Sequence, residues 1–129
     1  MQFGIFTVSD ITQDPTTGLW FQVVDQGSRT DNWLESSGSG MFVYALKVGV
    51  NRGYLDSSYL AVAQKGWQGM MSKVTTDGQG MPSITGAVKG MGVQNNYAGY
   101  VATTMMPLLT NSSHGLCSIL LAAAEMEAQ

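Results

Sequence analysis

The first stretch with side chains suited to binding a sugar ring is a β-prone run over residues 19–25, which follows a strong turn at residues 14–18. It holds Trp20, Gln22 and Asp25. An indole face packs on the C–H groups of a sugar, while an amide and a carboxylate form hydrogen bonds with its hydroxyls. Strict alternation places Trp20 and Gln22 on one face and Asp25 on the other, unless the strand bulges or ends first. The alternative is structural: Trp20 in the core, Gln22 anchoring a loop and Asp25 capping a turn.

A second stretch, Glu35, Ser36 and Ser37, lies where a helical pattern begins. Free N–H groups and the helix dipole at such an N-terminus favour a bound carboxylate. Glu35 would repel that anion, so its useful role would be to accept a hydrogen bond from a sugar hydroxyl. The alternative is plain N-capping by Ser36 or Ser37. His114 precedes the last predicted helix at the same end as this loop, as a binding residue or as a structural hydrogen-bonding group.

Other reactive residue types predict less. One cysteine and one histidine cannot make a zinc site of the usual Cys/His spacing or an intrachain disulfide, so we expect no metal and no cofactor. Cys117 lies in an apolar helical pattern and is expected to be a small core residue, and Asp77 is expected to form a turn. A carboxylate pair for acid–base catalysis on a sugar needs two acids that converge, and the spacing of Asp25, Asp31 and Glu35 does not make them converge. No catalytic residue is assigned.

The elements that must position these residues are mainly helical. Periodicity predicts an interior helix over residues 36–49, apolar on most faces, and a one-sided peripheral helix over residues 56–72. A second interior helix is predicted over residues 111–124. Glycines and prolines crowd residues 74–100, so regular structure there should be short, with a hairpin around residues 76–79. The expected fold class is all-α: three to four helices of an incomplete toroidal α/α barrel, with a short β-hairpin or strand in the loops.

Composition limits the partners. The 129 residues fit a single domain over residues 1–129, and a net charge of −3 with no basic run disfavours nucleic acid or an anionic membrane. The longest apolar stretches are too short to span a bilayer, and the N-terminus carries no secretory signal pattern. Only 12% of residues are charged. With two helices apolar on nearly every face, we expect a homo-oligomer, formed by side-by-side packing or by exchange of residues 1–12.

Several motifs carry a family resemblance. They are GLWFQVVD at residues 18–25, NWLESSGSGMFVYA at residues 32–45, GYL at residues 53–55 and NSSHG at residues 111–115. On these motifs the chain, over about residues 13–127, resembles the C-terminal third of the unsaturated rhamnogalacturonyl hydrolases, glycoside hydrolase family 105. Residues 1–12 are unmatched, and Ser112-Ser113 stands where the family often has an acidic residue and proline.

The resemblance implies an (α/α)6 barrel that acts on the unsaturated uronic acid residue of pectin oligosaccharides. In that family an acidic residue protonates the C4=C5 enol ether, water adds at C5 and the resulting hemiketal opens. The general acid belongs to earlier helices that have no counterpart here, so we expect this chain alone to be inactive. The resemblance also implies the cytoplasm, with secretion as the alternative. The competing hypothesis is a non-catalytic carbohydrate-binding or self-associating structural remnant.

Overall fold

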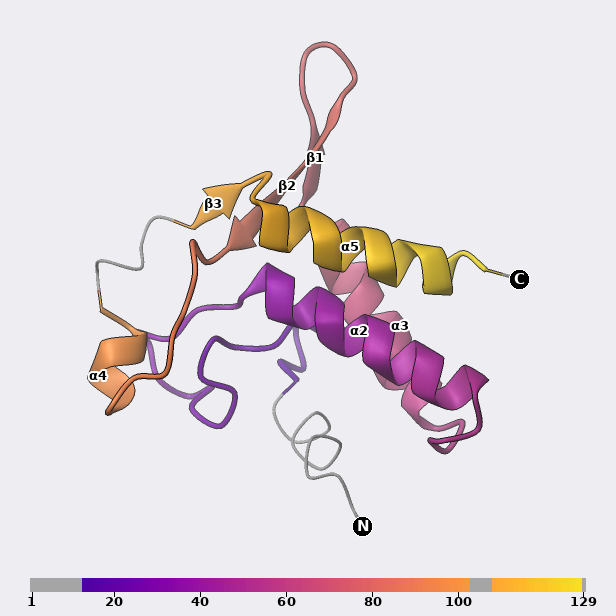
Figure 1. Ribbon diagram of the computed structural model, residues 1–129, viewed down its shortest axis with the longest axis horizontal. Helices are drawn as coiled ribbons and strands as arrows, with labels where there is room; N and C mark the ends of the chain where they lie inside the picture. The colour runs from indigo at the N-terminus through magenta and orange to yellow at the C-terminus, as the bar shows by residue number, and fades with distance from the viewer. Residues whose placement is uncertain (1–12, 103–107, 129) are drawn as a thin grey trace.

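The structure, a computed structural model, describes residues 13–102 and 108–128 (Figure 1). Its long helices are α2 (Ser36–Asn51), α3 (Tyr59–Met71) and α5 (Ser113–Met126). The connection between α3 and α5 holds β1 (Val74–Thr76), β2 (Pro82–Ala87), α4 (Tyr97–Tyr100) and β3 (Leu109–Thr110). The expected mixture of a few helices with a small β element is therefore present.

Helix α2 lies at the centre of the described fold. It packs extensively against both α3 and α5, whereas α3 and α5 barely touch each other. In Figure 1, α2 and α5 run side by side in the same direction, and α3 runs back the opposite way. A cluster of buried side chains joins the helices to the preceding loop: Trp20, Val43, Leu46, Ala63 and Ala122.

Glycines set how closely the helices approach. A Cβ at Gly66 of α3 would lie 2.7 Å from a Val43 methyl and 2.9 Å from the Trp20 ring. A Cβ at Gly40 of α2 would lie 2.8 Å from Ser118 Oγ of α5. Both helix contacts therefore depend on residues that lack a side chain.

Helix α5 differs from the interior helix that the sequence predicts. Its buried face carries small residues, Gly115, Ser118 and Ala122. Leu120 is 66% exposed, and Leu116 and Leu121 are exposed as well. Cys117, expected in the core, is also exposed. The prediction was wrong because periodicity shows that a helix is apolar, not which of its faces this chain covers.

The small sheet has the order β1-β2-β3 and is antiparallel throughout. β1 and β2 form the predicted hairpin, and Asp77 forms its turn by accepting hydrogen bonds from the N–H groups of Gln79 and Met81. The register of β2 against β3 shifts at Gly86, whose φ of 94° favours glycine. Neither β3 nor α4 was predicted, since both are too short to show a periodic pattern.

The helix ends follow ordinary capping chemistry. Ser112, one of the predicted caps, accepts a hydrogen bond from Gly115 N–H at the start of α5. Helix α2 continues to Asn51, two residues beyond the predicted end at Gly49. The predicted exchange of residues 1–12 lies outside the described residues. Across the part of the chain that the structure describes, no helix is both long and apolar enough to cross a membrane.

Candidate functional site

The loop from Leu19 to Leu34 carries three of the seven predicted site residues, Trp20, Gln22 and Asp25. It is not the strand that residues 19–25 predict: among the described residues its pairing consists of isolated bridges, Gln13 with Trp20 and Phe21 with Leu34. The chain turns after Phe21, and the buried side chain of Asn32 holds that turn. Its Nδ2 donates to the carbonyls of Val23 and Gln26, and its Oδ1 accepts from Val23 N–H. Strict alternation therefore does not govern where Gln22 and Asp25 point.

Trp20 lies inside the core. It is fully buried, and its ring packs on Phe42 with the ring centroids 5.2 Å apart. Its backbone N–H donates to Ser39 Oγ at 2.9 Å, and Ser39 Oγ in turn donates to Glu35 O. This is the structural alternative for Trp20.

Glu35 caps helix α2 with its own carboxylate. It accepts hydrogen bonds from Ser37 N–H, Gly38 N–H and Ser37 Oγ. It also accepts from Val88 N–H at 3.0 Å, which joins the start of α2 to the end of β2. The side chain is buried. Since its oxygens already hold these donors, this carboxylate is engaged in structure and has little capacity left for a sugar hydroxyl.

Ser36 and Ser37 are not the cap, in contrast to the capping alternative. Ser37 Oγ donates to Glu35. Ser36 is fully buried, and its Oγ has no hydrogen bond among the described residues and would lie 3.4 Å from a Cβ at Gly86. The first-turn N–H groups expected to bind a foreign carboxylate are therefore used by the carboxylate of Glu35.

A cavity of about 200 Å³ lies beside the N-terminus of α2. Trp20, Gln22, Glu35 and Phe42 line it. Three predicted site residues, Trp20, Gln22 and Glu35, therefore line one cavity. A cavity of this composition can accept an apolar ring face and exchange hydrogen bonds at Gln22.

A second cavity, of about 340 Å³, contains Asp25. Phe21 and Val24 line both cavities, so the two lie on either side of the same short segment. Asp25 itself is exposed. Asp14 also lines this cavity; burial raises the pKa of its carboxyl, but hydrogen bonds from Thr17 outweigh that effect and leave the pKa below its usual value.

His114 is exposed in the first turn of α5 and lines neither cavity. The expectation that it lies at the same end as the Glu35 loop is met. A Cβ on its neighbour Gly115 would lie 3.2 Å from Ala87, and the next residue along, Val88, donates to Glu35. Among the described residues, no group of three histidine, cysteine, aspartate or glutamate side chains is placed to hold a metal ion.

Three contributors to this region were missed at the sequence level: Asn32, Ser39 and the backbone of Val88. Asn32 stabilises the loop, Ser39 holds Trp20, and Val88 fixes Glu35. A buried asparagine within a short turn carries a weak signal, because asparagine hydrogen-bonds nearby backbone. Val88 gives none, since its N–H acts through a contact 53 residues away.

Comparison with known proteins shows that the sequence and the fold of this chain are similar to those of glycoside hydrolases. The family model described as Glycosyl Hydrolase Family 88 matches residues 8–129, so the prediction that residues 1–12 are unmatched was wrong for residues 8–12. Two curated relatives, Protein Atu3128 of Agrobacterium fabrum and the 24.9 kDa protein in picA locus of Rhizobium radiobacter, are each 28% identical over 127 residues. Each alignment covers 89% of this chain and 54% of the relative. The chain therefore spans about half the length of these relatives.

Solved structures share the fold. A family 105 glycoside hydrolase from C. acetobutylicum ATCC 824 aligns with a TM-score of 0.84 and 32% identity, covering 94% of this chain and 35% of that one. A possible family 105 member from Klebsiella pneumoniae aligns with a TM-score of 0.75 and 24% identity, and the alignment covers 91% of this chain and 28% of the Klebsiella chain. Another possible member, from Salmonella enterica, aligns with a TM-score of 0.78 and 23% identity, and the alignment covers 95% of this chain and 29% of the Salmonella chain. These last two show the likeness of fold alone.

Proposed function

The chain belongs to Glycosyl Hydrolase Family 88, and on that premise we propose that it forms part of a glycosidase acting on unsaturated uronic acid residues of rhamnogalacturonan oligosaccharides. The observation that carries the proposal is the cavity beside the N-terminus of α2. There the amide of Gln22 and the half-buried ring of Phe42 line one space, and the fully buried Trp20 packs on Phe42. Asp25 lines the adjoining cavity.

The proposed reaction is hydration of an enol ether. An acid protonates the C4=C5 double bond, water adds at C5, and the hemiketal opens to release the neighbouring sugar. We assign no general acid within this chain, because the buried carboxylate of Glu35 is held by Ser37, Gly38 and Val88, and Asp25 lines the second cavity but not the one that contains Gln22. An acid must be free to approach the reacting carbon, so this chain would contribute a wall of the sugar site and would not turn over substrate alone.

Binding and turnover can be tested separately. We expect an unsaturated rhamnogalacturonan disaccharide, titrated into the labelled chain, to shift the NMR signals of the Gln22 side-chain amide and of the Asp25 backbone amide. We also expect no loss of the ultraviolet absorbance of the conjugated double bond beyond the buffer rate. Gln22→Ala should remove the binding, whereas Gln64→Ala, at an exposed position on α3, serves as the matched control.

The outcomes discriminate clearly. Signal shifts confined to other surfaces, or equal binding by Gln22→Ala, would contradict the sugar site. Turnover by the chain alone that Asp25→Asn abolishes would contradict the inactivity and identify Asp25 as the acid.

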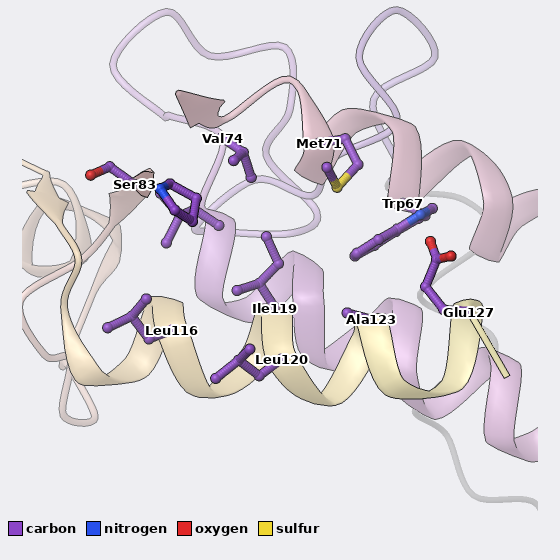
Figure 2. A pocket seen from close by; sticks show the side chains of 11 residues that line it. Trp67, Met71, Val74, Ser83, Leu116, Ile119, Leu120, Ala123 and Glu127 are labelled. Atoms are coloured by element: carbon purple, nitrogen blue, oxygen red, sulfur yellow. The ribbon is translucent and has the colours of Figure 1, made fainter. Parts of the chain in front are cut away.

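A second candidate function, self-association, is favoured by a groove of about 300 Å³ that α5 forms with α3 and β2 (Figure 2). Leu116, Ile119 and Leu120 of α5 face Trp67 and Met71 of α3 across it. Among the described residues that line the groove, Glu127 is the one charged residue and the rest are mainly apolar. We propose that a second copy of this chain covers the groove, because exposed apolar patches of this kind normally mark an interface.

Sedimentation at micromolar concentration tests this second proposal. The wild-type chain should sediment as an oligomer, and Leu120→Glu should sediment as a monomer because a charge in an apolar contact is costly. Val93→Glu is the matched control: Val93 is an exposed apolar residue, and neither it nor its chain neighbours line the groove. A monomeric wild type would exclude the proposal.

A further inference from the structure

Residues 91–101, which contain α4, form a small unit with its own hydrogen bonds; we call it the α4 strap. Gln94 N–H donates to Tyr100 Oη at 3.2 Å. Asn96 caps α4 by accepting from Gly99 N–H at 3.0 Å. In Figure 1 the α4 strap lies apart from the three long helices, beside the loop that precedes α2. Its internal bonds shape it but do not attach it to the rest of the fold.

Tyr97 makes the polar contacts of the α4 strap with this loop. Tyr97 Oη donates to Asp31 Oδ1 at 2.8 Å, and the guanidinium carbon of Arg29 lies 4.0 Å from the centroid of the Tyr97 ring. Arg29 Nε also donates to Asp31 Oδ1, at 3.2 Å. Within the ranges that the structure describes, the Tyr97–Asp31 bond is the one hydrogen bond between the α4 strap and this loop. The three side chains therefore form a closed cluster that spans the two segments.

The electrostatics of the cluster are consistent with this geometry. The hydrogen bond to Asp31 and the contact with Tyr97 raise the pKa of Arg29. The bonds from Arg29 and Tyr97 lower the pKa of Asp31. The ionised forms of both groups are therefore favoured. The cluster is nevertheless exposed, so salt screens it and each contact is weak.

We propose that Tyr97 is a latch that holds the α4 strap against the turn at residues 26–32 and opens locally while the helices stay folded. The turn is the structural partner: Asn32 N–H donates to Arg29 O, and Arg29 N–H donates to Gln26 O. Gly27 and Ser28 of the same turn line the second cavity, so the latch holds a turn that forms part of that cavity's wall. Weakly held exposed segments open far more often than a helical core.

Amide hydrogen exchange measured by NMR tests the latch. Tyr97→Ala removes the ring and the hydroxyl, so exchange at Gly99, Val101 and Asn32 should accelerate about tenfold. Tyr97→Phe keeps the ring over Arg29 and should accelerate it about threefold. Amides within α2 should be unchanged in both variants. Salt raised from about 0.05 to about 0.5 M should accelerate wild-type exchange in the same segments.

Two control variants separate a latch from general loosening. Tyr54→Ala removes another exposed tyrosine and should leave these amides within about twofold of wild type. Tyr100→Phe breaks a bond inside the α4 strap, so it should accelerate Gln94 without affecting Asn32. Wild-type rates at Asn32 in Tyr97→Ala would overturn the proposal, as would equal acceleration throughout α2. The side-chain Nε–H signal of Arg29 is a second readout, since its ring-current shift should survive in Tyr97→Phe and vanish in Tyr97→Ala.

Discussion

Helix α2 is covered on both flanks, whereas α5 is covered on one. Both are apolar in sequence, and both begin at the same end of the molecule, next to the last residues of β2. In α2 the side chains of Val43 and Leu46 enter the core. In α5 the leucines are exposed, Ser118 and Ala122 pack on α2, and Gly115 packs on β2.

The difference shows what hydrophobic content does not reveal. A helix packs closely where its neighbours allow its backbone to approach, and small residues permit that approach. The large apolar side chains on the other face of α5 are exposed, because no part of the described chain covers them. The comparison predicts that equivalent substitutions will have unequal costs in the two regions.

The largest expected effect lies in the core beside α2. Trp20→Ala should lower the free energy of unfolding by about 3 to 5 kcal/mol, because the ring is fully buried against Phe42 and Val43. Chemical denaturation gives the value. Tyr54→Ala, at an exposed ring, should change it by less than about 0.5 kcal/mol. A cost for Trp20→Ala as small as that of the control would return Trp20 to a role in ligand binding.

The next effect concerns the start of α2. Glu35→Ala removes the cap and leaves the buried N–H of Val88 without its partner. Loss of a cap costs about 1 kcal/mol, and an unpaired buried donor costs about 1 to 3 kcal/mol more. We expect a total of about 2 to 4 kcal/mol by denaturation. Glu127→Ala, at the exposed end of α5, is the control and should be near neutral. A neutral Glu35→Ala would show that its carboxylate is available for other work.

The α2–α5 contact itself should be less sensitive. A Cβ at Gly40 would lie 2.8 Å from Ser118 Oγ and 3.1 Å from the Ser118 carbonyl carbon, so Gly40→Ala forces the helices apart. Overpacking of this kind costs about 1 to 3 kcal/mol. Ser118→Gly in the same chain should recover part of that loss, because it removes the side-chain clash but not the backbone one. A double-mutant cycle measures the coupling, and strictly additive costs would contradict the close contact.

The sequence predicts the helices better than it predicts their surroundings. Residues 36–49, 56–72 and 111–124 become α2, α3 and α5, and the family 105 resemblance of their motifs is confirmed by the solved structures that share the fold. The hairpin at Asp77 is confirmed too. Local signals suffice for these features, since periodicity, caps and turn residues lie within a few positions of one another.

The site is harder to predict because its contacts are not local. Trp20 is β-prone in a β-prone run, yet its N–H bonds to Ser39 on a helix, and Glu35 is fixed by Val88. The turn held by Asn32 then redirects the chain. The sequence predicts Trp20, Gln22 and Glu35 as candidate binding residues. The tertiary contacts show that Trp20 is buried in the core and that the carboxylate of Glu35 already accepts hydrogen bonds from the backbone.

The smallest effect should come from the outward face of α5, and it completes the comparison. Leu120→Ala removes the same side chain as Leu46→Ala, but Leu120 is 66% exposed and Leu46 is 2% exposed. Most of the hydrophobic gain of a leucine comes from removing it from water. At a dilution where the chain is monomeric, Leu120→Ala should lower the free energy of unfolding by less than about 0.5 kcal/mol and Leu46→Ala by about 2 to 5 kcal/mol.

Denaturation repeated at higher protein concentration should show a larger loss of stability for Leu120→Ala if a second copy covers the groove, because association stabilises only the folded chain. Equal costs for the two leucines at dilution would mean that α5 is covered within the monomer, and the contrast between the two helices would then be wrong.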